Sequence, residues 1–274
     1  MKKALSFVGV LALFCFSPLA AQFSLKAGGG FFYASADDFA KARQSYIDLL
    51  KTYGVPYTSF FGTVHTGYDF ELEALYKLTK ALSFGLGVGY AKIPYSATIS
   101  IPSQSYNQTN RCSAVVIPIT LNIHGVIPVS SRIGFFLTAG AGLYVTTFNF
   151  EGYYDSGSGD YSSNTFKSTR AAFGVHGGAG IEVKLNATLS IVAEVLGRLA
   201  KASDFQGDWT QSESYAGTKM SASGSDQYFY YYEYQRNGVK YSNLWFDKTG
   251  PTGVLLARKG AVDLTGFSAV AAIK

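Results

Sequence analysis

Histidine and cysteine side chains are the groups in this chain that could bind a metal ion or act as bases. The histidines are His65, His124 and His176, which the strand pattern described below places at one rim, near the opposite end and in mid-wall. Side chains so far apart cannot converge on one ion, and no His/Cys spacing resembles a metal site. We therefore expect neither a metal nor a cofactor.

A serine or threonine beside a histidine would be the chemistry of a hydrolase or an acyltransferase. Hydroxyl residues near His65 in the sequence are Ser59, Thr63 and Thr66. No fixed spacing supports a pair among them. The glycine run Gly85–Gly89 lies inside an expected strand rather than between a strand and a helix, so it is not a nucleotide loop. We expect that the chain is not an enzyme.

Isolated charges of both signs alternate with apolar side chains along several segments. Asp69, Glu71 and Glu73, for example, alternate with Tyr68 and other large apolar residues. The full set of charges on such polar faces is Lys26, Asp69, Glu71, Glu73, Lys77, Arg170, Glu182, Lys184, Glu194 and Arg198. In a narrow barrel these charges would point inward and pair, because buried charges persist only when paired. We expect a plugged lumen, although a gated ion path would use the same residues.

A tyrosine-rich segment near the C-terminal end has the composition of a recognition surface. Asn237-Gly238 between two β-prone runs predicts a hairpin. Rigid amphipathic rings suit ligand capture or adhesion. The candidate binding residues are Tyr228, Tyr230, Tyr232, Tyr234, Tyr241 and Trp245. The alternatives are a wall extension above the membrane, in which the rings pack on each other, and two further wall strands, which would make ten.

The N-terminal residues resemble a secretory signal. Lys2 and Lys3 precede an apolar stretch from Ala4 to Phe16 and a small-residue cleavage zone. We expect residues 1–21 to be removed and 22–274 to form one domain. Of the 23 lysines and arginines two fall in the signal, which leaves 21 basic against 18 acidic residues. No basic run concentrates this charge, so we expect no nucleic-acid partner. Cys112 is then the only mature cysteine, so no internal disulfide can form.

Period-two alternation predicts eight strands that must position these side chains. The expected strands cover residues 23–33, 65–78, 81–93, 113–126, 132–148, 167–185, 188–202 and 261–274. Short connections alternate with long ones, the long ones being 34–64, 94–112, 149–166 and 203–260. Aromatic residues gather toward both strand ends, as interfacial girdles require. The first long connection also carries an expected helix from Asp38 to about Tyr53, either a lid or a helix packed on the barrel mouth.

This arrangement predicts an all-β fold, an eight-stranded antiparallel up-and-down transmembrane β-barrel with short periplasmic turns and long extracellular loops. It resembles the small outer-membrane barrels of the OmpA/OmpX kind, and Val262 to Ser268 look like their closing strand. The chain departs from that family in ending with Ile273-Lys274 instead of an aromatic residue.

The resemblance implies a monomer in the bacterial outer membrane. Its expected partners are outer-membrane lipid, lipopolysaccharide, the barrel-assembly machinery and an extracellular ligand bound through the loops. The leading functional expectation is structural support with surface binding or adhesion. A narrow porin-like diffusion channel and a lipid-modifying enzyme are the alternatives.

Overall fold

The computed structural model describes residues 22–35, 37–61, 65–102, 105–157 and 159–274. The expected signal peptide lies outside these residues. The prediction of an all-β antiparallel fold is confirmed: the described chain has fourteen strands in one sheet and one helix, α2 (Asp37–Thr52). Among the described residues, no helix is long and apolar enough to cross a membrane.

One group of strands closes on itself. Hydrogen bonding runs from β1 through β3, β4, β5, β6, β7, β8 and β14 and back to β1. The bounds of these strands are Phe23–Ala34, Thr66–Lys77, Leu82–Ile101, Tyr106–Pro128, Ile133–Asp155, Tyr161–Lys184, Ser190–Ser203 and Gly266–Ile273. We call this closed part the ring. Because the ring is closed, none of its strands has an unpaired edge within the ring.

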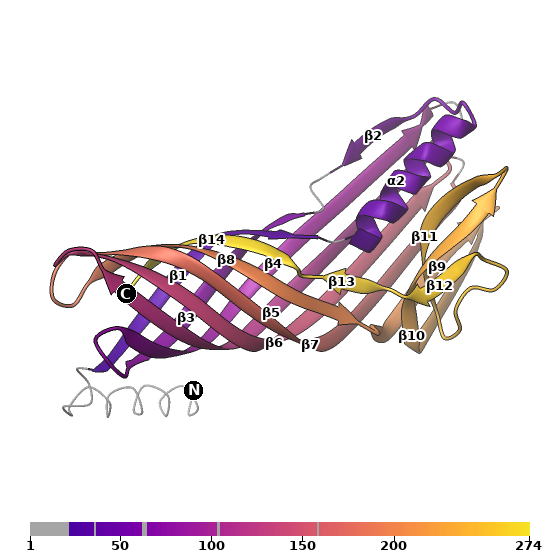
Figure 1. The fold of residues 1–274 in the computed structure, drawn as a ribbon. Coiled ribbons are helices and arrows are strands. Elements are labelled where there is room, and N and C mark those ends of the chain that lie inside the picture. Colours follow the sequence, from indigo (N-terminus) through magenta and orange to yellow (C-terminus); the bar gives the residue numbers. More distant parts are fainter. Residues whose placement is uncertain (1–21, 36, 62–64, 103–104, 158) are drawn as a thin grey trace.

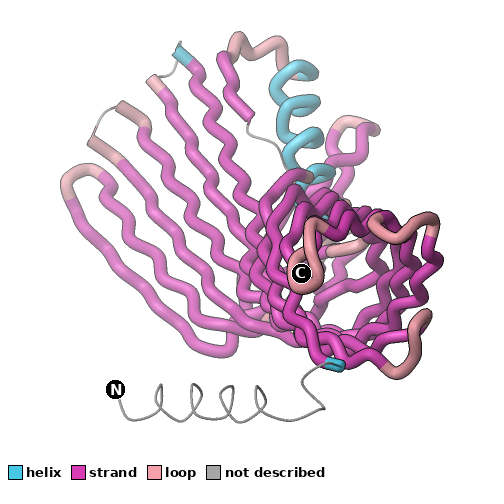
Figure 2. The backbone as a smooth tube through the Cα atoms, turned by 90° about the vertical axis from the view of Figure 1, so that its left-hand side faces the viewer, coloured by secondary structure: helices cyan, strands magenta, loops and turns pink. Residues whose placement is uncertain are grey.

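The ring has a turn end and an extended end. Tight turns join β3 to β4, β5 to β6 and β7 to β8, and β1 begins and β14 finishes at the same end (Figure 1). At the other end β4, β5, β6 and β7 run far beyond the ring. Figure 2 shows that these protruding strands fan out as an open, curved sheet. We call this protruding part the extension.

The expectation of only eight strands was wrong, because the structure has fourteen. The six others are β2 (Thr58–Phe61), β9 (Gln206–Tyr215), β10 (Thr218–Arg236), β11 (Val239–Asp247), β12 (Leu256–Lys259) and β13 (Ala261–Asp263). The expected last strand is divided between β13 and β14. The sheet continues from β7 through β9 and β10 to β11, which lies at one margin of the extension.

Two expected long loops are strands. Residues 94–112 belong mostly to β4 and β5, which pair as far as Ile101 and Tyr106. Residues 149–166 belong mostly to β6 and β7, which pair as far as Asp155 and Tyr161. Both segments do alternate, but serine, threonine and asparagine occupy one face, and such a polar composition resembles that of a loop.

The hairpin predicted around Asn237-Gly238 is present as β10 and β11. Both turn residues have positive φ, 52° at Asn237 and 79° at Gly238, which is the requirement of a type I′ turn. This hairpin belongs to the extension sheet rather than to the ring. The expectation of a wall extension therefore describes it better than two further strands of the closed wall.

The outward face of the strands changes character along their length. In β6 the exposed outward side chains near the turn end include Phe135, Leu137 and Leu143, whereas Glu151 is exposed in the extension. In β7 Phe173 is 72% exposed, but the outward residues farther along are Thr169, Lys167 and Thr165. Side-chain hydroxyls pair across this outer surface, as in Thr165–Thr210 at 2.6 Å. The apolar band of β6, Ile133 to Val145, is long enough to cross a bilayer, for which a tilted strand needs about 9–11 residues.

Aromatic residues mark both edges of this apolar band. Near the turn end Phe23 and Tyr76 lie 4.9 Å apart between ring centroids. At the opposite edge Tyr68 lies 6.4 Å from Tyr90, and Tyr33 lies 5.3 Å from Phe267. Two such belts are typical of a barrel wall that meets a membrane interface on each side.

Helix α2 lies along the open side of the extension (Figures 1 and 2). Its Phe39 ring stacks on Phe229 at 5.5 Å and lies 5.1 Å from Phe148 at the mouth of the ring. Its other end buries Leu50 against Ile99 and Ile101 of β4. The helix was expected from Asp38 to about Tyr53, so its existence is confirmed. We call it the roof.

Candidate functional site

Four of the predicted lumen charges come together inside the ring. Lys26 Nζ of β1 lies 2.7 Å from Glu71 Oε1, 3.5 Å from Glu73 Oε2 and 2.5 Å from Glu194 Oε2. The Lys26, Glu73 and Glu194 side chains are each less than 5% exposed. They meet because β1, β3 and β8 all point alternate residues inward. The Lys26 ammonium group thus contacts three carboxylates inside the lumen.

A second set of polar groups completes this cluster. Glu73 Oε1 accepts a hydrogen bond from Asn122 Nδ2 at 2.6 Å and lies 2.8 Å from His124 Nε2. Thr138 donates its hydroxyl to Glu194 Oε1 at 2.7 Å and lies 3.0 Å from the other ring nitrogen of His124. Together with the four charges, these side chains form a continuous polar layer across the lumen. We call it the polar layer.

His176 extends the polar layer toward the mouth of the ring. Its Nε2 lies 2.7 Å from Asn122 Oδ1 and its Nδ1 lies 3.1 Å from the Tyr144 hydroxyl. A Cβ built at Gly140 would lie 2.5 Å from His176 Nε2, so only glycine leaves room for this contact. The expectation that the three histidines stand apart was wrong for His124 and His176, which are linked through Asn122.

The other predicted lumen charges lie outside this contact set. Glu182 pairs with Lys274 at 2.8 Å near the turn end. Arg198 lies over the Phe32 ring at 4.5 Å and donates to Ser268 Oγ. Asp69 is buried, and its Oδ1 has no hydrogen-bond partner among the described residues.

Three predicted members do not belong to the lumen interior. Lys77 and Lys184 are exposed at the turn end. Arg170 stands at the mouth, where its Nε donates to the backbone oxygen of Asp204 at 2.5 Å. Lys77 and Lys184 are on the inward face of their strands. Each is the last residue of its strand, so its side chain lies at the rim of the ring and not inside the lumen.

Apolar layers lie on both sides of the polar layer. Toward the turn end Phe136, Val192, Val270 and Ala272 form a small cluster. At the mouth a larger cluster includes Phe148, Phe166, Phe205 and Phe229, each no more than 1% exposed. Two cavities within the lumen measure about 60 and 20 Å³, room for only a few water molecules.

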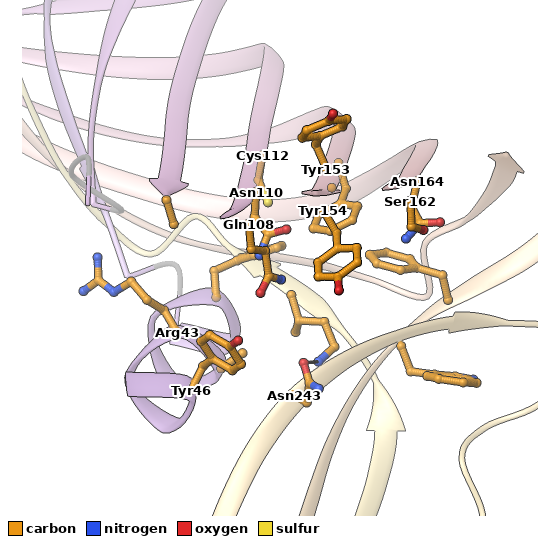
Figure 3. Close-up of a pocket in the computed structure, with 18 of the residues that line it drawn as sticks. Arg43, Tyr46, Gln108, Asn110, Cys112, Tyr153, Tyr154, Ser162, Asn164 and Asn243 are labelled. Atoms are coloured by element: carbon orange, nitrogen blue, oxygen red, sulfur yellow. Dashed lines mark hydrogen bonds between the residues drawn. The ribbon is translucent and has the colours of Figure 1, made fainter. Parts of the chain in front are cut away.

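The large cavity of the described structure lies in the extension. It measures about 710 Å³ and is bounded by the roof and by β4, β5, β6, β7, β9, β10 and β11. Figure 3 shows Gln108, Asn110 and Tyr154 of the sheet on one side and Tyr46 and Arg43 of α2 on the other. We call it the roofed cavity. Its volume falls in the range of about 300–1,000 Å³ that is common for small-molecule sites.

The roof is fixed over this cavity by specific contacts. The buried Asp38 carboxylate accepts hydrogen bonds from Arg258 and from the Ala261 backbone N–H. Tyr46 of α2 lies 3.1 Å from the Tyr106 hydroxyl, and Tyr241 of β11 donates to Thr52. The Asp38 side chain thus joins the start of α2 to β12 and β13.

The predicted tyrosine surface divides between two environments. Tyr232 and Trp245 line the roofed cavity, and Trp209, which sequence reasoning missed, lines it too. Tyr241 is buried, and its ring packs on Tyr234 at 5.6 Å. Tyr228 and Tyr230 contact each other, and Lys259 lies over the Tyr228 ring. The six residues therefore do not form one surface.

Burial disfavours ionisation of two side chains that line the cavity. Burial raises the pKa of the Cys112 thiol and of the Tyr95 hydroxyl above their usual ranges. Burial, and then the hydrogen bond with Tyr46, raise the pKa of the Tyr106 hydroxyl, which donates to the cavity residue Gln108. Among the described residues, no group of three or more His, Cys, Asp or Glu side chains could hold a metal ion. His65 lies at the mouth of the ring, with its Nδ1 3.0 Å from the Ala34 backbone oxygen.

A closed strand ring, an apolar outer band between aromatic belts and a polar interior are the features of a barrel that crosses an outer membrane. No curated protein matches the chain. The family described as the outer membrane protein beta-barrel domain matches residues 6–249, which is most of the sequence. The chain therefore belongs to the family of outer membrane β-barrel proteins and is a protein of the bacterial outer membrane.

Proposed function

We propose that this protein is a non-enzymatic outer-membrane barrel whose lumen is closed and whose extension binds a ligand outside the cell. The observation that carries the proposal is the distribution of space: cavities of about 60 and 20 Å³ lie in the lumen, and one of about 710 Å³ lies in the extension. A solute path requires continuous space along the lumen of the ring, whereas a ligand-binding site requires only a cavity that is accessible from the surface.

The ring itself supports a likeness to the small OmpA/OmpX kind of barrel. Eight strands are about the number at which side chains just fill the interior. Here they fill it in three layers, of which the polar layer lies between two apolar ones. The ion pairs of the polar layer suit a plug, because moving the Lys26 ammonium group would leave three carboxylates without their cation.

The orientation follows from the connections. Short turns at one end and long protruding segments at the other are typical of periplasmic and extracellular ends, respectively. The extension, the roof and the roofed cavity therefore face the outside of the cell. The polar outer surface of the extension, with Lys167 and Glu151, suits that aqueous setting.

Conductance tests the closed lumen. Protein purified from outer membranes is inserted into a planar bilayer after a heat-dependent gel shift has established that it is folded. We expect no stable conductance steps, while a known porin inserted in the same way conducts. Steady steps of several hundred picosiemens would contradict the closed lumen and would favour the narrow channel.

A further inference from the structure

We infer that the roofed cavity binds a neutral saccharide. This inference rests on the proposed function and names the chemical class of its ligand. It is carried by the arrangement of side chains on the inner face of the extension, which the strand register fixes.

The inner face of the extension carries registered rows of side chains. One row runs across five strands as Tyr95, Cys112, Phe150, Phe166 and Trp209. The next row outward runs as Ala97, Asn110, Gly152, Asn164 and Gln211. Aromatic and apolar groups thus form the floor, and carboxamides form a line directly above it.

One member of the carboxamide row offers a ligand an unsatisfied polar atom. Gly152 stands between Asn110 and Asn164, where a Cβ would lie 3.2 Å from the Phe150 ring and 3.3 Å from Asn110 Oδ1. The Asn164 Oδ1 atom is buried and accepts no hydrogen bond from any described residue. A buried acceptor without a donor costs free energy, and a ligand hydroxyl would satisfy it.

The charge of the cavity selects a neutral ligand. Its lining contains Arg43 and Asp247 but no lysine, histidine or glutamate. The tyrosine and cysteine groups whose pKa is raised by burial add no charge. A phosphate or sulfate group would therefore find one guanidinium and no cluster of cations, which is unlike a site built for anions.

The combination of amides and rings distinguishes a sugar from an acyl chain. Carboxamides both donate and accept hydrogen bonds, as sugar hydroxyls do. Aromatic rings such as Trp209 and Trp245 offer flat apolar faces with a polar edge, which suit the C–H face of a pyranose ring. An acyl chain would cover the unpartnered Asn164 Oδ1 atom without supplying a donor, at a cost in free energy.

Tryptophan fluorescence reads this cavity directly, because the chain has two tryptophans and both line it. The probes are maltotriose, cellotriose, mannotriose and chitotriose, each titrated to about 10 mM against the full protein in nanodiscs. Trialanine, decanoate and sialyllactose represent peptide, acyl and anionic ligands. We expect a saturable change with at least one neutral trisaccharide and none with decanoate or sialyllactose.

Asn164→Leu removes the unpartnered acceptor while keeping the size of the side chain. Because that acceptor is unsatisfied within the protein, we expect the variant to fold at least as well as the parent. We expect its saccharide affinity to fall about tenfold or more. The matched control is Thr165→Leu, the next residue on β7, which faces outward and should leave affinity unchanged.

The inference is overturned if no neutral trisaccharide gives a saturable signal, if trialanine or decanoate binds instead, or if Asn164→Leu binds as the parent does. A failure of the proposed function would be seen in a different experiment, as stable conductance steps in the planar bilayer. A silent barrel without saccharide binding would refute the ligand class alone, whereas a silent barrel that binds trialanine would keep the binding role with another ligand.

Discussion

The ring and the extension share four strands, β4, β5, β6 and β7, yet the faces of these strands have opposite characters in the two regions. In β6 the ring portion points Leu137 and Leu143 outward and Thr138 and Gly140 inward. Farther along, the same strand points Glu151 outward and Phe148 inward. The alternation never changes phase, because the register to β5 and β7 is continuous. What changes is the medium outside the wall, from lipid to water.

This inversion explains why the two regions hold their interiors differently. Inside the ring the narrow lumen is filled by glycines, ion pairs and hydrogen bonds. The sheet of the extension is open, so only its inner face is covered, by the aromatic floor and by the roof. The first arrangement leaves little space, and the second leaves the roofed cavity.

The largest effect is expected from removing the cation of the polar layer. Lys26→Met leaves Glu71, Glu73 and Glu194 without it, and breaking a buried pair of this kind costs about 3–5 kcal/mol. The measurement is the urea midpoint, which is the urea concentration at which half of the protein is unfolded. The folded protein is followed as the band that shifts on a gel when the sample is heated, which we call the heat-modifiable band. Lys77→Met removes an exposed lysine at the turn end and should not move that midpoint. Equal midpoints for both variants would contradict the polar layer as a structural unit.

The roof should detach without unfolding the ring. Phe39→Ala removes a ring packed on Phe148 and Phe229, a loss of about 3 kcal/mol in a packed core. We expect trypsin to cleave within α2, which carries Lys41 and Lys51, while the heat-modifiable band persists. Loss of that band together with the roof would show that ring and extension fold as one unit.

A charge on the outer surface should be costly in one region only. Leu137→Arg places a cation near the middle of the apolar band, where it costs about 2–4 kcal/mol. Ser212→Arg places the same group on the exposed outer face of β9 and should be nearly neutral. Comparable losses in assembly yield for both variants would remove the distinction between a lipid-facing and a water-facing wall.

A smaller and local effect is expected at the tip of the extension. Gly238→Ala introduces a Cβ at a residue with φ of 79°, which costs about 1 kcal/mol. Amide hydrogen exchange should accelerate in β11 and leave the ring strands unchanged. Exchange that stays slow throughout β11 would mean that the turn does not limit the hairpin.

The smallest change is expected at Cys112, at the floor of the roofed cavity. Burial raises the pKa of this thiol, so the nucleophilic thiolate is scarce at pH 8. In a Cys15→Ser chain, iodoacetamide should leave the folded protein unmodified and label the urea-unfolded one completely. Rapid labelling of the folded protein would show that the floor of the cavity is open to solvent.

The sequence predicted the parts of the fold in which lipid imposes a pattern. Aliphatic residues such as Leu72 and Ile119 repeat at every second position, and that repeat identified the ring strands. The extension strands alternate too, as in Tyr95, Ala97 and Ile99 against Ser96 and Thr98, but small polar residues there look like loop composition. Chain composition alone does not separate a polar strand from a polar loop.

The sites were predicted less completely because they depend on register across several strands. Lys26, Glu73 and Glu194 were expected to pair, since all three carry charge on inward positions. Asn122 and Thr138 were missed as members, although both lie on polar faces, because neutral side chains give no charge signal. The carboxamide row was not predictable, since Asn110 and Asn164 are more than fifty residues apart in sequence and meet only through the pairing with Gly152.

The most direct test of the inverted wall is the accessibility of outward positions along β6. Spin labels are placed singly at Leu137, Leu143, Thr147 and Glu151 in the protein reconstituted in bilayers, and relaxation by oxygen is compared with relaxation by a water-soluble nickel chelate. We expect oxygen to dominate at Leu137 and Leu143 and the chelate to dominate at Glu151, with the change near Thr147. Oxygen-dominated relaxation at Glu151, or chelate-dominated relaxation at Leu143, would contradict the assignment of ring to lipid and extension to water.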